Sequence, residues 1–132
     1  MGAMGRGKCI KLVMFISFFL IGLLISGGVH ASTTHIVGGS QGWGLSVSYT
    51  DWVAESSFAA GDTLVFNYPA GAHDVIHVSA LGYRRCQASA RELAKVATTG
   101  NDKFTLKKGA NYFICSYEGH CSACLKIKVN VN

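Results

Sequence analysis

Residues 109–131 have the sequence GANYFICSYEGHCSACLKIKVNV and decide the fold. Within them, apolar and polar side chains alternate over residues 125–131 (LKIKVNV), which is the period of a strand with one face in the core and one in solvent. Residues 111–115 (NYFIC) are aromatic and β-rich, and they follow a Lys-Lys-Gly turn. We therefore expect two strong strands joined by a loop that is crowded with cysteine and histidine.

The same period of two recurs upstream, with turn residues at short intervals. Further strand candidates are residues 35–37, 63–68, 75–78 and 103–106. About seven short strands in a domain of about 100 residues predict an all-β fold, a two-sheet Greek-key β-sandwich. One short peripheral helix is expected at residues 89–96, because Ser89 and Glu92 have the spacing of a capping box. Four aromatic side chains are expected in the core: Trp43, Trp52, Phe66 and Tyr112.

The N-terminus has a different pattern. Residues 12–25 (LVMFISFFLIGLLI) are preceded by three basic residues and followed by small residues up to Ala31. This apolar run is shorter than the roughly 18–20 residues that span a bilayer, so we expect no membrane anchor. The pattern predicts a secretory signal peptide over residues 1–31, cleaved after Ala31. The mature domain is then residues 32–132, and we expect it to be secreted.

The net charge and the spacing of the charged residues exclude some classes of function. Removing residues 1–31 takes three of the 12 basic residues and none of the 7 acidic ones, so the mature net charge is 9 minus 7, or +2. The remaining lysines and arginines form no basic run interleaved with aromatics, which excludes nucleic acid as an expected partner. Asp74 and Glu118 lack a second carboxylate at a fixed spacing, so we interpret both as solvated loop charges and expect no enzymatic activity.

The cysteines and histidines carry the chemistry. With Cys9 removed, four cysteines remain, and because they allow three disulfide pairings, a metal-free secreted domain with two bridges stays open. The crowding of residues 115–124 favours a metal site instead, since a loop held by two strands can direct a thiolate and an imidazole to one point. His73 offers a second imidazole, and His77 competes with it. Two imidazoles and one thiolate are the donor set of blue copper.

At this point the chain resembles a known family, the phytocyanins, which are plant copper proteins of the cupredoxin fold. The matching motifs occur in the family's order and are residues 37–43 (VGGSQGW), 60–68 (AGDTLVFNY), 73–75 (HDV), 112–115 (YFIC) and 119–121 (GHC). The resemblance covers residues 34–132 and is nearest to the plantacyanin, or basic blue protein, subclass, because no stalk follows the domain. It implies a secreted or apoplastic protein that carries single electrons on one copper ion.

The resemblance also implies the site residues. His73, Cys115 and His120 fall on the copper-ligand positions, and His73 is preferred to His77. At the axial position, where a methionine is expected, this chain has Leu125, which has no donor atom. The implied site is therefore three-coordinate with an apolar cap, and its reduction potential should exceed that of a methionine-capped relative.

The same resemblance implies a disulfide between Cys86 and Cys121. Cys124 is then unpaired, and three roles stay open for it: a small buried residue, an intermolecular bridge or a fourth metal ligand. Two other functions also stay open, a metal-free cell-wall interaction domain and a zinc-binding module built on Cys115, His120, Cys121 and Cys124. The redox partner, a small molecule or a protein, is not specified by the sequence, and we expect a monomer.

Overall fold

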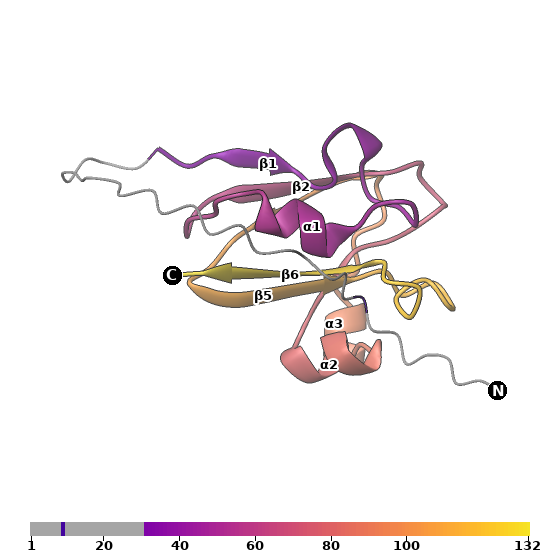
Figure 1. The fold of residues 1–132 in the computed structure, drawn as a ribbon. Helices are drawn as coiled ribbons and strands as arrows, with labels where there is room; N and C mark the ends of the chain where they lie inside the picture. Colours follow the sequence, from indigo (N-terminus) through magenta and orange to yellow (C-terminus); the bar gives the residue numbers. More distant parts are fainter. Residues whose placement is uncertain (1–8, 10–30) are drawn as a thin grey trace.

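The computed structural model describes Cys9 and residues 31–132 (Figure 1). Apart from Cys9 and Ala31, the predicted signal peptide lies outside the described residues. Six strands form two three-stranded sheets in this part of the chain. The first sheet has the order β1 (Thr34–Ile36), β2 (Thr63–Asn67), β4 (Asn101–Thr105), and the second has the order β3 (Ile76–Val78), β5 (Gly109–Ile114), β6 (Lys126–Val131).

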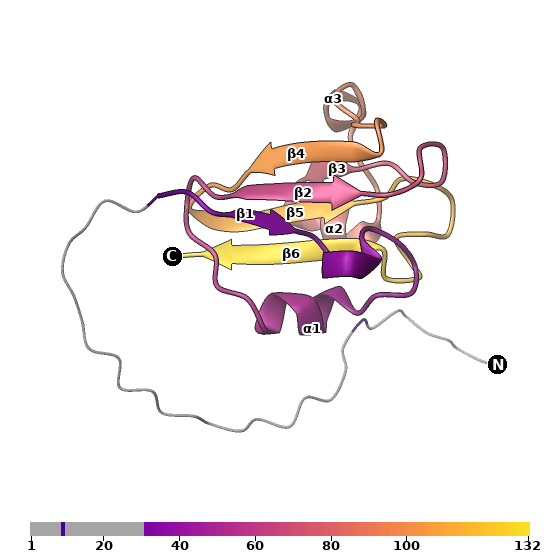
Figure 2. The ribbon, with the colours of Figure 1, turned by 90° about the horizontal axis from the view of Figure 1, so that it is seen from above.

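The two sheets lie one above the other, as Figures 1 and 2 show from two directions. β1 pairs with β2 in parallel, and the other three pairings are antiparallel. The predicted β-sandwich is therefore confirmed. The described residues form six strands rather than about seven. The six segments named as strand candidates are all present and differ from the observed strands at their ends, where pairing rather than side-chain period decides the boundary.

The core lies between the sheets and follows from the alternation along the strands. Phe66 of β2 meets Phe113 of β5 with ring centroids 5.2 Å apart, so one aromatic contact joins the two sheets. Trp43 packs its ring edge-on against Phe66 at 4.9 Å. Of the four aromatic side chains expected in the core, Trp43 and Phe66 are fully buried, and Trp52 is half-buried against the same cluster. Tyr112 is half-buried in a second, smaller cluster, where its ring packs against that of Tyr83.

Gly42 shows why the turn after β1 needs glycine. Its φ is +70°, and a Cβ there would lie 2.5 Å from the carbonyl oxygen of Asn67. That close approach lets the Trp43 amide donate to the same carbonyl at 2.7 Å. The turn thereby fixes Trp43 against the end of β2.

Short helices cover the edges and the outer face. The predicted helix is present as α3 (Ala90–Leu93), with both hydrogen bonds of the Ser89–Glu92 capping box. The structure adds α1 (Tyr49–Ala54) and α2 (Ala80–Arg85), as well as the 3₁₀ turn η1 (Gly39–Gln41). In Figure 1, α2 and α3 lie below the second sheet, on the side away from the first. None of the helices in the described residues has the length and apolarity that crossing a bilayer requires.

The carboxylate of Asp62 ties β1 to the turn before β2. It accepts hydrogen bonds from the amides of Thr33 and Ala59, each at 2.9 Å, and lies 2.9 Å from Nε2 of His35. These hydrogen bonds, that from Thr33 first and that from His35 next, lower the pKa of Asp62 to about 2. Asp62 is buried, so its carboxylate and the three groups that contact it hold these segments together at the edge of the core.

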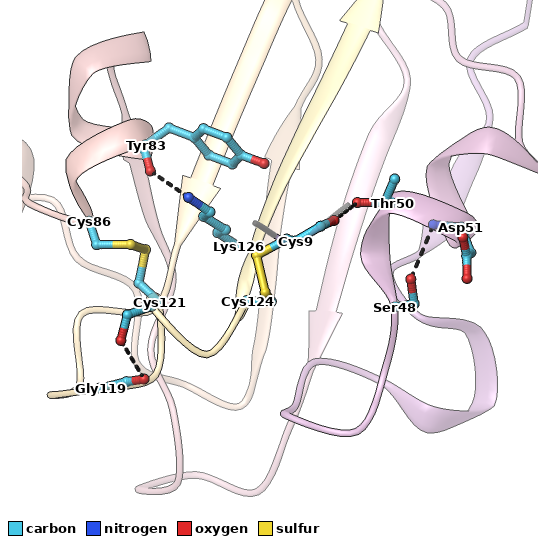
Figure 3. Close-up of a disulfide and its surroundings, with 11 residues drawn as sticks. Cys9, Ser48, Thr50, Asp51, Tyr83, Cys86, Gly119, Cys121, Cys124 and Lys126 are labelled. Carbon is cyan, nitrogen blue, oxygen red and sulfur yellow. Dashed lines mark hydrogen bonds between the residues drawn. A yellow bond between two sulfur atoms is a disulfide. The ribbon is translucent and has the colours of Figure 1, made fainter. Parts of the chain in front are cut away.

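Two disulfides hold the domain (Figure 3). Cys86 is bonded to Cys121, as the resemblance implies, and this bridge joins the end of α2 to the loop before β6. The expectation of an unpaired Cys124 is wrong for the chain as the structure describes it, because Cys124 is bonded to Cys9. Cys9 belongs to the predicted signal peptide, and Cys124 therefore has no partner in the predicted mature domain. Among the described cysteines, Cys115 alone is a free thiol.

Candidate metal centre

Three donor side chains meet at the end of the sandwich where β5 ends and β6 begins, opposite the C-terminus (Figure 1). Nδ1 of His73 is 3.1 Å from Nδ1 of His120, and Sγ of Cys115 is 3.6 Å from Nδ1 of His120. The donor atoms of all three residues lie within 4.8 Å of one another, so one ion can contact all of them. The three residues are here called the donor trio.

The donor trio comes from two connections, since Cys115 and His120 lie at different points of the β5–β6 connection and His73 lies in another. Cys115 directly follows β5 and is fully buried, because the core packs around it. His73 lies in the connection between β2 and β3, and His120 lies in the loop between β5 and β6, where its amide donates to the carbonyl of Tyr117. Both histidines are half-buried, so the trio lies just beneath the surface.

The backbone of Leu125 connects two members of the trio. Its amide donates to the carbonyl of His120 at 3.0 Å, and its carbonyl accepts from the amide of Cys115 at 3.1 Å. The Leu125 side chain is fully buried in the same core cluster as Cys115. Leu125 immediately precedes β6 rather than beginning it, and its side chain adds only hydrocarbon to this end of the core.

Asp74 is buried, so the prediction that it is a solvated loop charge is wrong. Only 4% of its surface is exposed, and its carboxylate accepts hydrogen bonds from both the amide (2.7 Å) and the hydroxyl of Ser116. The indole of Trp43 donates to the Asp74 carbonyl at 3.0 Å. Asp74 therefore ties the His73 segment to the Cys115 segment. A lack of paired carboxylates says nothing about this structural role, whereas the position of Asp74 directly after a candidate ligand is a usable signal for it.

Glu118 is exposed, as expected for a solvated loop charge. His77 does not join the trio. Its ring stacks on Phe113 with centroids 4.9 Å apart, and its side chain is exposed. His77 lies on β3, which begins only at Ile76, whereas His73 lies in the turn before it, so the two side chains do not share one face of a strand. The structure thus brings His73, and not His77, to Cys115 and His120.

The surroundings favour uncharged donors when no cation is near them. Burial raises the pKa of the Cys115 thiol, against hydrogen bonds that lower it. Burial and the charge of His120 lower the pKa of His73, and Asp74 opposes this change. A bound cation reverses the balance for the thiol, because it stabilises the thiolate directly. The donor trio is therefore suited to a cation rather than to an anion.

The disulfides exclude one alternative. A zinc site built on Cys115, His120, Cys121 and Cys124 needs three thiolates, but Cys121 and Cys124 are both oxidised. The bond between Cys9 and Cys124 also excludes Cys124 as a fourth metal ligand in the chain as described. One thiolate and two imidazoles remain, and this soft and intermediate donor set suits copper.

The chain is similar to known copper proteins. The family model described as a plastocyanin-like domain matches residues 43–125. The protein named chemocyanin from Lilium longiflorum is 39% identical over 127 residues, which are 96% of this chain and 97% of the relative. The basic blue protein of Cucumis sativus is 43% identical over 96 residues, which are 73% of this chain and 96% of the relative.

Two solved structures have the same fold. The cucumber basic protein, described as a blue copper protein, matches with a TM-score of 0.69 and 40% identity, over 75% of this chain and 99% of the other. Spinach plantacyanin matches with a TM-score of 0.62 and 40% identity, over 69% of this chain and 94% of the other. Together with the donor trio, these matches identify the cofactor as one copper ion.

Proposed function

Because the chain belongs to the phytocyanins, the plastocyanin-like copper proteins, we propose that it carries single electrons, with His73, Cys115 and His120 as the copper ligands. The convergence of these three side chains within 4.8 Å is the observation that supports the proposal most directly. When bound, copper supplies one-electron chemistry by cycling between Cu(II) and Cu(I). The chain acts as a carrier and not as an enzyme.

The protein's own contribution is to hold the ligands still. Cys115 provides the thiolate, and the two histidines provide imidazoles that suit both oxidation states. The Asp74 carboxylate and the Leu125 backbone connect the segments that bear these ligands. A trio tied in this way needs little rearrangement when one electron is gained or lost, which is what an electron carrier requires.

Leu125 caps the site in this proposal. Its buried side chain belongs to the same cluster as Cys115 and offers no donor atom. Because the Leu125 side chain would offer a bound copper ion no donor atom, Cu(II) would lose more stabilisation than Cu(I), and the reduction potential would be higher than with methionine at this position.

The half-buried ring of His120 is the proposed route for electrons. Its centroid lies 5.6 Å from the ring of Tyr117, which is 37% exposed, so the site reaches the surface through these two residues. The partner is a redox-active small molecule or protein that reaches this edge. The chain acts as a monomer and binds no nucleic acid in this proposal.

The proposed location is outside the cell, in the apoplast. Residues 1–31 carry the pattern of a cleaved secretory signal. The Cys86–Cys121 bridge fits an oxidising compartment.

A visible spectrum tests the proposal. Protein loaded with one equivalent of Cu(II) should show an intense band near about 600 nm from the Cys115 thiolate. Cys115→Ser should abolish the band, whereas His77→Gln, outside the trio, should keep it. A colourless copper-loaded protein, or a band that persists in Cys115→Ser, contradicts the ligand assignment. Protein that retains no copper after unbound metal is removed would favour the metal-free interaction domain.

A further inference from the structure

The outer face of the second sheet carries positive charge without negative charge. Alternate residues of β6 point away from the core, and two of them are Lys126 and Lys128. α2 packs against β3 and β5 and ends in Arg84 and Arg85. The residues of α2, β3, β5 and β6 include no aspartate or glutamate. These elements thus hold four of the nine basic residues of the predicted mature domain and none of its seven acidic ones.

Two tyrosine rings hold the two lysines of β6. Nζ of Lys126 lies 4.4 Å from the centroid of the Tyr83 ring and donates to the Tyr83 carbonyl at 3.1 Å (Figure 3). Nζ of Lys128 lies 5.8 Å from the ring centroid of Tyr112, its partner in the β5–β6 pairing. The two tyrosine rings are 5.2 Å apart. We call Tyr83, Tyr112, Lys126 and Lys128 the cationic face. Because its lysines are already placed, they lose less side-chain freedom on binding than unrestrained lysines do.

The charge of the cationic face is not neutralised within the domain. Among the described residues, neither Lys126 nor Lys128 forms an ion pair with a carboxylate. Glu92, on the neighbouring helix α3, is engaged elsewhere, because its carboxylate accepts from the amides of Ser79 and Ser89, each at 2.8 Å. The two ammonium groups can therefore pair with an anion from outside the chain.

The surface beside these lysines is hollowed. A depression of about 170 Å³ separates α1 from β6 and is lined by six side chains besides that of Ile127: Tyr49, Thr50, Val53, Tyr83, Lys126 and Lys128. Pockets for drug-sized ligands have roughly 300–1,000 Å³, so this depression admits a single small ring. All of its lining residues belong to the predicted mature domain, and Cys9 is not among them.

These features favour a sugar polymer over other anionic partners. A protein partner needs a central apolar anchor, and a membrane needs apolar side chains that enter it. None of the large exposed apolar side chains of the described residues lines the depression. Single-stranded nucleic acid needs rings that are free for stacking, whereas the Tyr83 ring is in contact with Tyr112 and Lys126. A sugar ring is small and bears many hydroxyl groups, and its carboxylate pairs with ammonium groups.

We propose that the cationic face binds a carboxylated polysaccharide, with one sugar ring in the depression beside Tyr83 and carboxylates paired with Lys126 and Lys128. Residues two apart on a strand are about 7 Å apart, so the two lysines can contact carboxylates of different sugars. The depression includes neither His120 nor Tyr117, so a bound polymer leaves the proposed electron route open. The inference rests on the proposed location outside the cell and not on the copper chemistry.

Titration calorimetry with two matched polymers tests the proposal. The full chain is expressed in a eukaryotic host, purified and loaded with copper. The probes are polygalacturonate and the same polymer with its carboxylates methyl-esterified, which removes the charge and keeps the sugar backbone. We expect binding to polygalacturonate alone, and we expect it to weaken as salt is raised. The 600 nm band should not change when the polymer binds.

Single charge changes locate the binding surface. Lys128→Gln should weaken binding about threefold, and Lys126→Gln with Lys128→Gln about tenfold, as expected for exposed charge pairs. Lys103→Gln is the matched control, because it removes the same charge from an exposed position of β4 in the other sheet. At physiological ionic strength, charges are screened beyond about 8 Å, so this control should keep the parent affinity.

Several results would overturn the proposal. They are no binding, equal binding to the methyl ester, an equal loss of affinity in Lys103→Gln, and tighter binding to phosphatidylserine vesicles or to single-stranded DNA than to polygalacturonate. The 600 nm band of the same samples reports separately on folding and on the copper site. A band without polymer binding defeats only this inference, and polymer binding without a band defeats only the proposed electron carriage.

Discussion

Asp74 and Ser116 are joined by two hydrogen bonds, and each residue directly follows a member of the donor trio. The carboxylate accepts from the Ser116 amide and hydroxyl, so it fixes the separation of two segments that are far apart in the chain. At this end of the sandwich, these two hydrogen bonds hold the two segments side by side, as strand pairing does within the sheets. The positions of His73 and Cys115 depend on it.

Asp74→Ala should therefore loosen the site. Both hydrogen bonds are lost and the Ser116 amide loses its acceptor, so we expect a weaker and broader 600 nm band and a loss of about 2 kcal/mol in the free energy of unfolding. Visible spectroscopy and urea titration measure the two effects.

Asp74→Asn is the matched control, because its side-chain oxygen can still accept from the Ser116 amide. It should keep a band close to that of the parent protein. An unchanged spectrum in Asp74→Ala would show that the tie does not position the ligands.

The axial position can be tested by adding a donor. Leu125→Met should lower the reduction potential and keep the blue colour, since a thioether stabilises Cu(II) relative to Cu(I). Voltammetry measures the potential. Leu125→Ile, which changes shape without adding a donor, should stay close to the parent. A lowered potential in both variants would assign the effect to packing instead.

The Cys86–Cys121 bridge should contribute strongly to stability. Its cysteines are separated by 35 residues, and closing a loop of that length is worth roughly 3–4 kcal/mol in the chain-entropy model. The double variant Cys86→Ala with Cys121→Ala, which leaves neither cysteine unpaired, should lose about that much in urea denaturation. A loss below about 1 kcal/mol would mean that other contacts already order this loop.

Asp62 should make stability depend on acid pH. Its pKa is about 2 in the folded chain against an ordinary value of 3.8, so the unfolded chain binds the proton first as pH falls. The stabilisation is therefore complete above about pH 4 and is lost as pH falls through 2, by roughly 1–2 kcal/mol.

Urea midpoints at pH 5 and pH 2.5 measure this dependence. Asp62→Asn should be less stable than the parent at pH 5, and the difference should shrink at pH 2.5. Glu118→Gln, at an exposed carboxylate, should follow the parent at both values. An equal pH dependence in Asp62→Asn and the parent would assign the acid sensitivity to other carboxylates.

The predictions that succeeded rest on local patterns. β6 follows from alternation, and β5 follows from aromatic and β-rich residues after a turn. α3 follows from a capping box whose two hydrogen bonds are present. The donor trio follows from motifs that matched in order, and the structure brings its residues together. In each case the information lies in a few neighbouring residues or in a family pattern.

The features that were missed depend on contacts between distant segments. α1 and α2 have six residues each, too short to show a helical period. Asp74 looks like a loop charge until Ser116 is placed beside it. Cys124 looks unpaired once Cys9 is assigned to a signal peptide. Only the folded chain reveals these partners.

At Leu125, the backbone and the side chain have separate roles, since the backbone holds the loop and the side chain lies in the core beside Cys115. Its amide and carbonyl, which any amino acid except proline supplies in full, hold the chain between His120 and Cys115. Its side chain is left to set the polarity beside the ligands. Substitution at this one position can therefore adjust the redox properties of the centre while the scaffold stays constant, so related chains can diversify in potential without rebuilding the loop.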